Sequence, residues 1–262
     1  MKQETFRKRH RERRVEAGGL GWGVIQTKGR KGGPTLILVP GTLGTADIFW
    51  NQMAALGQHV RIVSLTVPNA RTITGLADAL AKLMDKLGIA KASLLGSSLG
   101  GYLVQHFAAR HPERIETLFV ANTLIDPTRL RGPSVAEARR MPAKQHLEIN
   151  QARVRTMPTP DAGFKLMQKA LLDAGLRLGA ATLKMRVLIV RGGPPVPKLS
   201  LPQSRIVTID SKDDQILPQA ELAAVRRRYP KARHVRLPMG GHFPYITRPE
   251  IYIELFRRHL IG

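Results

Sequence analysis

The sequence predicts a protein of the α/β class, built on a mostly parallel, doubly wound sheet with helices on both faces. Short apolar runs, typical of buried strands, alternate along the chain with segments whose apolar residues recur at helical spacing. This alternation is typical of strand–helix–strand units and therefore of a parallel sheet. The length of 262 residues suits a single domain of this class, residues 1–262.

The first half of the chain supplies the opening elements of the sheet. An antiparallel hairpin is expected first, with arms at 14–16 and 22–27 and a turn at 17–19. Strands are expected next at 35–39, 60–65, 92–95 and 115–120, with helices between 73 and 87 and from 99 to about 111. The second half supplies strands at 205–209 and 235–237 and a terminal helix at 249–260.

A helical insertion interrupts this alternation. From about 125 to 185 the apolar residues follow helical patterns that are broken at Pro133, Pro142, Pro158 and Pro160. We expect a helical cap over about 125–185 and a core formed by 1–124 and 186–262. The apolar run 187–190 reads as a strand, which is either an extra strand or the element that closes the cap.

The segment Gly96-Ser97-Ser98-Leu99-Gly100 fits the G-x-S-x-G pattern of a nucleophile elbow. In an elbow, a sharp strand-to-helix turn projects the serine hydroxyl above the sheet, and small residues two before and two after it let strand and helix pass closely. The pattern makes Ser98 the candidate nucleophile. The alternatives are a glycine-rich turn that only packs, or one that binds phosphate.

A serine nucleophile needs a base and an acid that orients the base, and both are expected at the carboxyl ends of later strands. His242 lies on a glycine-flanked loop after 235–237, and it alone of the eight histidines has this context. Acidic residues follow the strand 205–209. Asp214 is preferred as the acid because it stands two residues before Ile216, and Asp213 remains the alternative.

Acyl transfer also needs hydrogen-bond donors aimed at the oxyanion. The amide of Leu99, the residue after the nucleophile, is one expected donor. The amide of Thr42, in the loop Pro40-Gly41-Thr42-Leu43-Gly44, is the other. The same glycine-containing loop also fits a flexible connection without a catalytic role.

These residues resemble those of the α/β-hydrolase superfamily over nearly the whole chain. Within it the chain most resembles the maspardin-like group, through the segments 40–49, 95–102 and 240–245. The resemblance implies the α/β-hydrolase fold, with its opening hairpin and inserted cap. In maspardin itself the position matching His242 is asparagine, which fits a binding or scaffold role. The histidine of this chain favours an enzyme, and a non-catalytic scaffold or binding protein remains the alternative.

The function expected is that of a serine hydrolase, a carboxylesterase acting on a small or medium acyl ester. Ser98, His242 and Asp214 would form the triad, with an acyl-enzyme intermediate and the Leu99 and Thr42 amides as oxyanion donors. No metal or organic cofactor is required. The motif does not separate an esterase from a lipase, thioesterase, amidase, carbon–carbon hydrolase or perhydrolase.

Composition suggests partners and location. The chain carries 42 basic and 19 acidic residues, a formal charge of +23, and residues 129–198 alone hold fourteen basic and four acidic residues. This charge fits a self-repelling soluble surface, a cap that attracts anionic ester substrates, or adhesion to nucleic acid or anionic membrane through 226–228. Specific nucleic-acid binding is not expected, because no binding fold or aromatic platform accompanies the charge.

Without cysteine, a secretory signal or a membrane-spanning stretch, a cytoplasmic location is expected.

Overall fold

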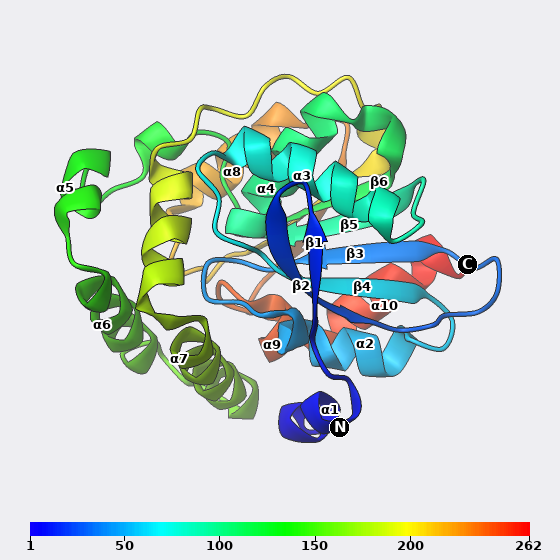
Figure 1. The fold of residues 1–262 in the computed structure, drawn as a ribbon, viewed down its shortest axis with the longest axis horizontal. Helices are drawn as coiled ribbons and strands as arrows, with labels where there is room; N and C mark the ends of the chain where they lie inside the picture. Colours follow the sequence, from blue (N-terminus) through cyan, green and yellow to red (C-terminus); the bar gives the residue numbers. More distant parts are fainter.

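The computed structural model describes residues 1–262 and is organised around one eight-stranded sheet (Figure 1). The strands run in the order β1-β2-β4-β3-β5-β6-β7-β8 across the sheet. Their bounds are β1 Arg13–Ala17, β2 Leu20–Gln26, β3 Thr35–Val39, β4 Arg61–Thr66, β5 Ala92–Ser97, β6 Ile115–Ala121, β7 Ile206–Ser211 and β8 Arg233–Leu237.

The sheet is parallel apart from strand β2, which runs antiparallel to both of its neighbours, β1 and β4. From β4 to β8 every pairing is parallel. The carboxyl ends of these strands therefore meet at one edge, where the loops that follow them come together. The predicted opening hairpin is confirmed as β1 and β2, and the mostly parallel doubly wound sheet is confirmed with it.

Helices cover both faces of the sheet. In Figure 1, α3, α4 and α8 lie above the strands and α2, α9 and α10 below them. The α-helices are α1 Gln3–Arg9, α2 Trp50–Leu56, α3 Ile73–Lys86, α4 Leu99–Arg110, α5 Val135–Arg140, α6 Ala143–Arg155, α7 Ala162–Arg191, α8 Gln219–Arg228, α9 Pro244–Thr247 and α10 Pro249–Leu260. Short 3₁₀ turns are η1 Ala46–Phe49, η2 Pro112–Arg114, η3 Pro127–Arg129 and η4 Gln203–Arg205.

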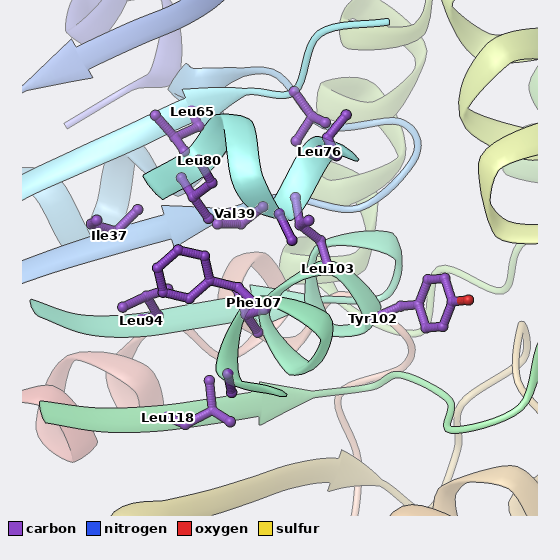
Figure 2. Packing of buried hydrophobic residues seen from close by; sticks show 14 of the residues in the cluster. Ile37, Val39, Leu65, Leu76, Leu80, Leu94, Tyr102, Leu103, Phe107 and Leu118 are labelled. Atoms are coloured by element: carbon purple, nitrogen blue, oxygen red, sulfur yellow. The ribbon is translucent and has the colours of Figure 1, made fainter. Parts of the chain in front are cut away.

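The central strands are apolar on both sides because each face packs against helices. In β3, Ile37 and Val39 belong to the core on the α3 and α4 side, whereas Leu36 and Leu38 belong to the core on the opposite side. Figure 2 shows the first of these cores, where Phe107 of α4 packs among side chains of the central strands. Because the central strands pack on both faces, their carboxyl ends and the loops that follow them are held in place.

The segment between β6 and β7 is helical, as expected, and consists of η3, α5, α6 and α7, followed by the loop 192–202 and η4. Helices α5, α6 and α7 lie together at the left in Figure 1. α7 is kinked at Gly179, whose φ of 76° is tolerated by glycine. The division into a cap over about 125–185 and a core remains a prediction.

The strand expected at 187–190 is wrong, because these residues form the last turn of α7. Leu183, Arg186 and Ile189 are buried at three-residue spacing, as on one face of a helix. A short apolar run has the same composition in a buried strand and in a half-buried helix, so periodicity could not separate the two. None of the helices combines the length and apolar character needed to cross a membrane.

Candidate active site

Ser98 occupies a strained turn between β5 and α4. Its φ and ψ are 55° and −118°, a conformation that costs a non-glycine residue about 1–3 kcal/mol. Hydrogen bonds hold the turn on both sides: the Ser98 amide donates to the Ala121 carbonyl at 3.0 Å, and the Ser98 carbonyl accepts from the Thr123 hydroxyl at 2.6 Å. This geometry is that of a nucleophile elbow.

The glycines of the motif are required by close backbone approaches. A Cβ at Gly96 would overlap the carbonyl oxygen of Gly100, and a Cβ at Gly100 would overlap that of Val39. Gly41 is close as well, since its Cβ would stand 3.0 Å from the Cβ of Ser98. The loop after β3 and the elbow after β5 are therefore packed directly against each other.

His242 and Asp214 form a buried pair. The Nδ1 of His242 lies 2.7 Å from Asp214 Oδ2, and their side chains are 2% and 0% exposed. An ionised carboxylate only accepts, so His242 Nδ1–H donates and the other ring nitrogen, Nε2, is left as a proton acceptor. Both residues line the same cavity as Ser98.

Asp214 is kept ionised by its surroundings. Burial, the largest influence, raises its pKa, but the electrostatic attraction and hydrogen bond of the His242 ring and the donors Leu217 and Asn122 together hold the pKa below its usual value. Asp214 Oδ1 accepts from the amides of Ile216 at 2.8 Å and Leu217 at 2.9 Å. The carboxylate is thereby fixed in orientation as well as in charge.

Asp213, the alternative acid, has a different set of contacts. Its Oδ1 accepts hydrogen bonds of 2.9 Å from the amides of Gly240 and Gly241. It therefore ties the loop that carries His242 to the loop after β7, while Asp214 contacts the imidazole itself. The catalytic roles of both aspartates, and of Ser98 and His242, stay predictions.

Asn122 is a site residue that the sequence analysis missed. It follows β6 with a φ of 39°, and its Nδ2 donates to Asp214 Oδ2 at 2.9 Å and to the Gly241 carbonyl at 3.3 Å. Asparagine tolerates this left-handed backbone better than most residues. The available signal was its position at the carboxyl end of the strand next to the elbow strand.

The two residues whose amides are expected to bind an oxyanion, Leu99 and Thr42, line the cavity together with Ser98. Leu99 begins α4, so its amide has no acceptor within the helix. Thr42 also lines the cavity, and its amide donates no hydrogen bond within the protein. Neither amide therefore donates to a backbone carbonyl of the protein, and their role as oxyanion donors stays a prediction.

The loop of Thr42 is held by Arg186, a fully buried residue of α7 that the sequence analysis missed. Its guanidinium donates to the carbonyls of Thr42 and Gly44, both at 2.9 Å, and of Val67 at 2.6 Å. Burial lowers the pKa of Arg186 to about 10, so the group is still charged at neutral pH. No sequence pattern indicates this role, because Arg186 and Thr42 are more than 140 positions apart along the chain.

A cavity of about 750 Å³ separates the predicted triad from the helical segment. Ser98, Leu99, Thr42, Asp214 and His242 form its floor. Its other walls come mainly from the segment between β6 and β7, including Arg131, His146, Asn150, Arg153, Met157 and Arg191. The cavity is large enough to hold a small molecule between the strand ends and the helices.

Two further observations complete the site. His146 is buried beside the cavity, with its Nε2 2.9 Å from the Ala138 carbonyl oxygen. No group of three or more histidine, aspartate or glutamate side chains is arranged to hold a metal ion.

The fold is that of the α/β hydrolases, and comparison with known families gives the same class of protein. The model of the Alpha/beta hydrolase family matches residues 36–255, and the chain belongs to this family. Among curated proteins it is similar to maspardin of Danio rerio, at 27% identity over 87% of this chain and 75% of the relative. Maspardin of Homo sapiens is 28% identical over 84% and 73%.

Relatives named as enzymes are similar over comparable lengths. A pimeloyl-[acyl-carrier protein] methyl ester esterase of Aeromonas hydrophila is 26% identical over 88% of this chain and 96% of the relative. The enol-lactonase of Burkholderia xenovorans LB400 has the same fold, with a TM-score of 0.79 at 21% identity over 95% and 100% of the two chains. A thermophilic esterase of Thermogutta terrifontis has a TM-score of 0.77 at 22% identity over 94% and 97%. The family and its named relatives support a hydrolase.

Proposed function

We propose that this protein is a serine hydrolase that cleaves a carboxylic ester through an acyl-enzyme intermediate. The observation that carries the proposal is the buried Asp214–His242 pair opening onto the same cavity as the strained Ser98. The family membership and the esterase relatives add support.

In the first half of the reaction, Ser98 Oγ attacks the ester carbonyl carbon while Nε2 of His242 takes the hydroxyl proton. Asp214 stabilises the resulting imidazolium and holds its orientation. The negative charge on the carbonyl oxygen is stabilised by the amides of Leu99 and Thr42. Collapse of the tetrahedral intermediate expels the alcohol, which receives the proton from His242 and leaves an ester on Ser98.

In the second half, water attacks the acyl-enzyme carbonyl and gives a proton to His242. The second tetrahedral intermediate breaks its bond to Ser98 Oγ, which recovers the proton. The products are a carboxylic acid and the free enzyme. Every proton transfer passes through the one imidazole, which is why its orientation by Asp214 matters in both halves.

The test is covalent labelling by a fluorophosphonate probe, which reacts with activated serines. We expect the wild-type protein to be labelled and to hydrolyse at least one member of a panel of short and medium acyl esters, and Ser98→Ala to do neither. Labelling of Ser98→Ala equal to that of wild type would contradict the proposal.

The similarity to maspardin favours a second candidate, a binding or scaffold protein that keeps the fold without turnover. The presence of His242, paired with Asp214, argues for the enzyme. A protein that is neither labelled nor active on the panel, while folded by circular dichroism, would favour the scaffold.

A further inference from the structure

Three arginines line the cavity that contains Ser98. Arg131 follows η3, Arg153 lies in the last turn of α6, and Arg191 ends α7. All three belong to the segment between β6 and β7 that forms the walls opposite the predicted triad. The part of the cavity lining that this segment supplies therefore carries three positive charges, with Arg131 and Arg153 exposed and Arg191 half-buried.

No carboxylate balances this charge. The only acidic residue lining the cavity is Asp214, and its oxygens are engaged by His242, Asn122 and two backbone amides. The acidic residues of segment 129–198 are engaged elsewhere: Glu137 with Ser134, Glu148 with Lys144, Asp161 with Arg248 and Asp173 with Arg7. The three arginines thus have no anionic partner within the protein.

Arg153 and Arg191 line the same cavity, and the charge of Arg153 acts on Arg191. Arg191 is half-buried, and burial and then the charge of Arg153 lower its pKa. One of its nitrogens, Nη2, donates to the Arg131 carbonyl at 2.8 Å, which anchors the guanidinium beside the cavity. A bound anion would interact favourably with the positive charges that line this cavity.

We propose that Arg153 and Arg191, with Arg131, form a subsite for a negatively charged oxygen group on the substrate, so that the enzyme prefers esters that also carry a carboxylate or a phosphate. The inference rests on the proposed function and names the substrate class of the same site. Arginine suits this role because its planar, permanently charged guanidinium binds such groups through two parallel hydrogen bonds.

The simpler interpretation is that these arginines only solubilise the surface, as others of the 42 basic residues do. Arg155 provides the matched control for it. It lies on the same helix as Arg153, two residues further along, is exposed and does not line the cavity. Arg155→Gln therefore removes the same charge from α6 without changing the subsite.

The test measures kcat/KM on two matched pairs of esters at low ionic strength. Monomethyl adipate against methyl hexanoate places the charge on the acid side, and 4-acetoxybutanoate against butyl acetate places it on the alcohol side. We expect the wild-type protein to prefer the anionic member of at least one pair by about tenfold or more. The double variant Arg153→Gln/Arg191→Gln should lose that preference, Arg155→Gln should keep it, and added salt should reduce it.

Two outcomes overturn the inference, and they are distinguishable. Hydrolysis of the neutral and anionic members at equal rates, or an equal fall for both in the double variant, would overturn the subsite and leave the serine hydrolase intact. Hydrolysis of none of the four esters by a protein that fluorophosphonate does not label would overturn the proposed function and the subsite with it. As a readout without turnover, adipate should slow fluorophosphonate labelling of wild type more than that of the double variant.

Discussion

Arg186 holds the carbonyl of Thr42 by a hydrogen bond of 2.9 Å, and this contact joins the inserted helices to the loop expected to bind the oxyanion. The same guanidinium binds Gly44 and Val67, so one buried cation fixes three carbonyls. Buried backbone carbonyls need such partners, and here a side chain of α7 supplies them. The helical segment therefore does more than cover the cavity, because it sets the shape of its floor.

Replacing Arg186 by methionine is expected to lower kcat by about tenfold or more while changing KM little. A fixed oxyanion donor is worth about 10² to 10³ in kcat, and a loop without its anchor no longer holds the Thr42 amide in place. Arg186→Lys should restore part of kcat, because an ammonium can reach some of the three carbonyls. Steady-state kinetics on a neutral ester, measured well below the melting temperature of each variant, checks this; an unchanged kcat would contradict it.

Asp214→Asn and Asp213→Asn are expected to differ in kind. Asp214 contacts the imidazole, so its replacement removes the acceptor that selects the tautomer, and kcat should fall by about 10³ to 10⁴. Asp213 contacts only backbone amides of the histidine loop, so its replacement should lower the melting temperature and reduce kcat much less. Kinetics and thermal unfolding of the two variants, side by side, measure the difference.

Equal losses of kcat in the two variants would contradict that prediction and reopen Asp213 as the acid. Asn122→Ala serves as an intermediate case, since Asn122 donates a hydrogen bond to Asp214 and none to His242. It should lower kcat less than Asp214→Asn does.

Site residues that belong to a local motif could be predicted from the sequence, whereas those whose roles depend on contacts far along the chain could not. Ser98 and its glycines form a local motif, and His242 is recognisable because parallel strands bring their carboxyl ends to one edge. Asn122 and Arg186 carry no such pattern, because their roles come from contacts with residues 92 to 144 positions away. Sequence patterns report which face of an element is buried, not which distant carbonyl or carboxylate it meets.

The choice between Asp213 and Asp214 illustrates the same limit. Both follow β7, and the sequence favoured Asp214 by its spacing from Ile216. The structure gives the physical difference, since the two carboxylates point to different partners on the same loop. The error at 187–190 has a different cause: a short apolar run is a local pattern that buried strands and helices share, and here it is helical.

Gly96→Ala is expected to destabilise the fold by about 3 kcal/mol or more. Its Cβ would overlap a backbone oxygen of α4, which cannot move without displacing the helix. Gly175→Ala in α7 is the matched control, because its Cβ would have only an ordinary contact of 3.7 Å with Leu43. That variant should be neutral or more stable by up to about 1 kcal/mol, since alanine favours the helix. Denaturant unfolding of both variants tests this, and equal stabilities would contradict it.

His106 is expected to make the fold sensitive to acid below neutral pH. It is buried in α4 against Tyr102, and burial lowers its pKa from 6.5 to about 4. The folded state therefore keeps the imidazole neutral while the unfolded state takes up a proton below pH 6.5. The free energy of unfolding should fall between pH 6.5 and about 4, by at most about 1.4 kcal/mol per pH unit from this one group, and the contribution should level off below that range.

His106→Gln should remove this part of the pH dependence, because glutamine does not titrate. The measurement is the free energy of unfolding against pH for the wild type and the variant, so that carboxylates such as Asp214, whose lowered pKa also costs stability in acid, cancel in the comparison. His59→Gln is the control, since His59 is exposed and its replacement should leave the wild-type slope. If His106→Gln and wild type lost stability in parallel from pH 6.5 to 4, His106 would not be the group held neutral by the fold.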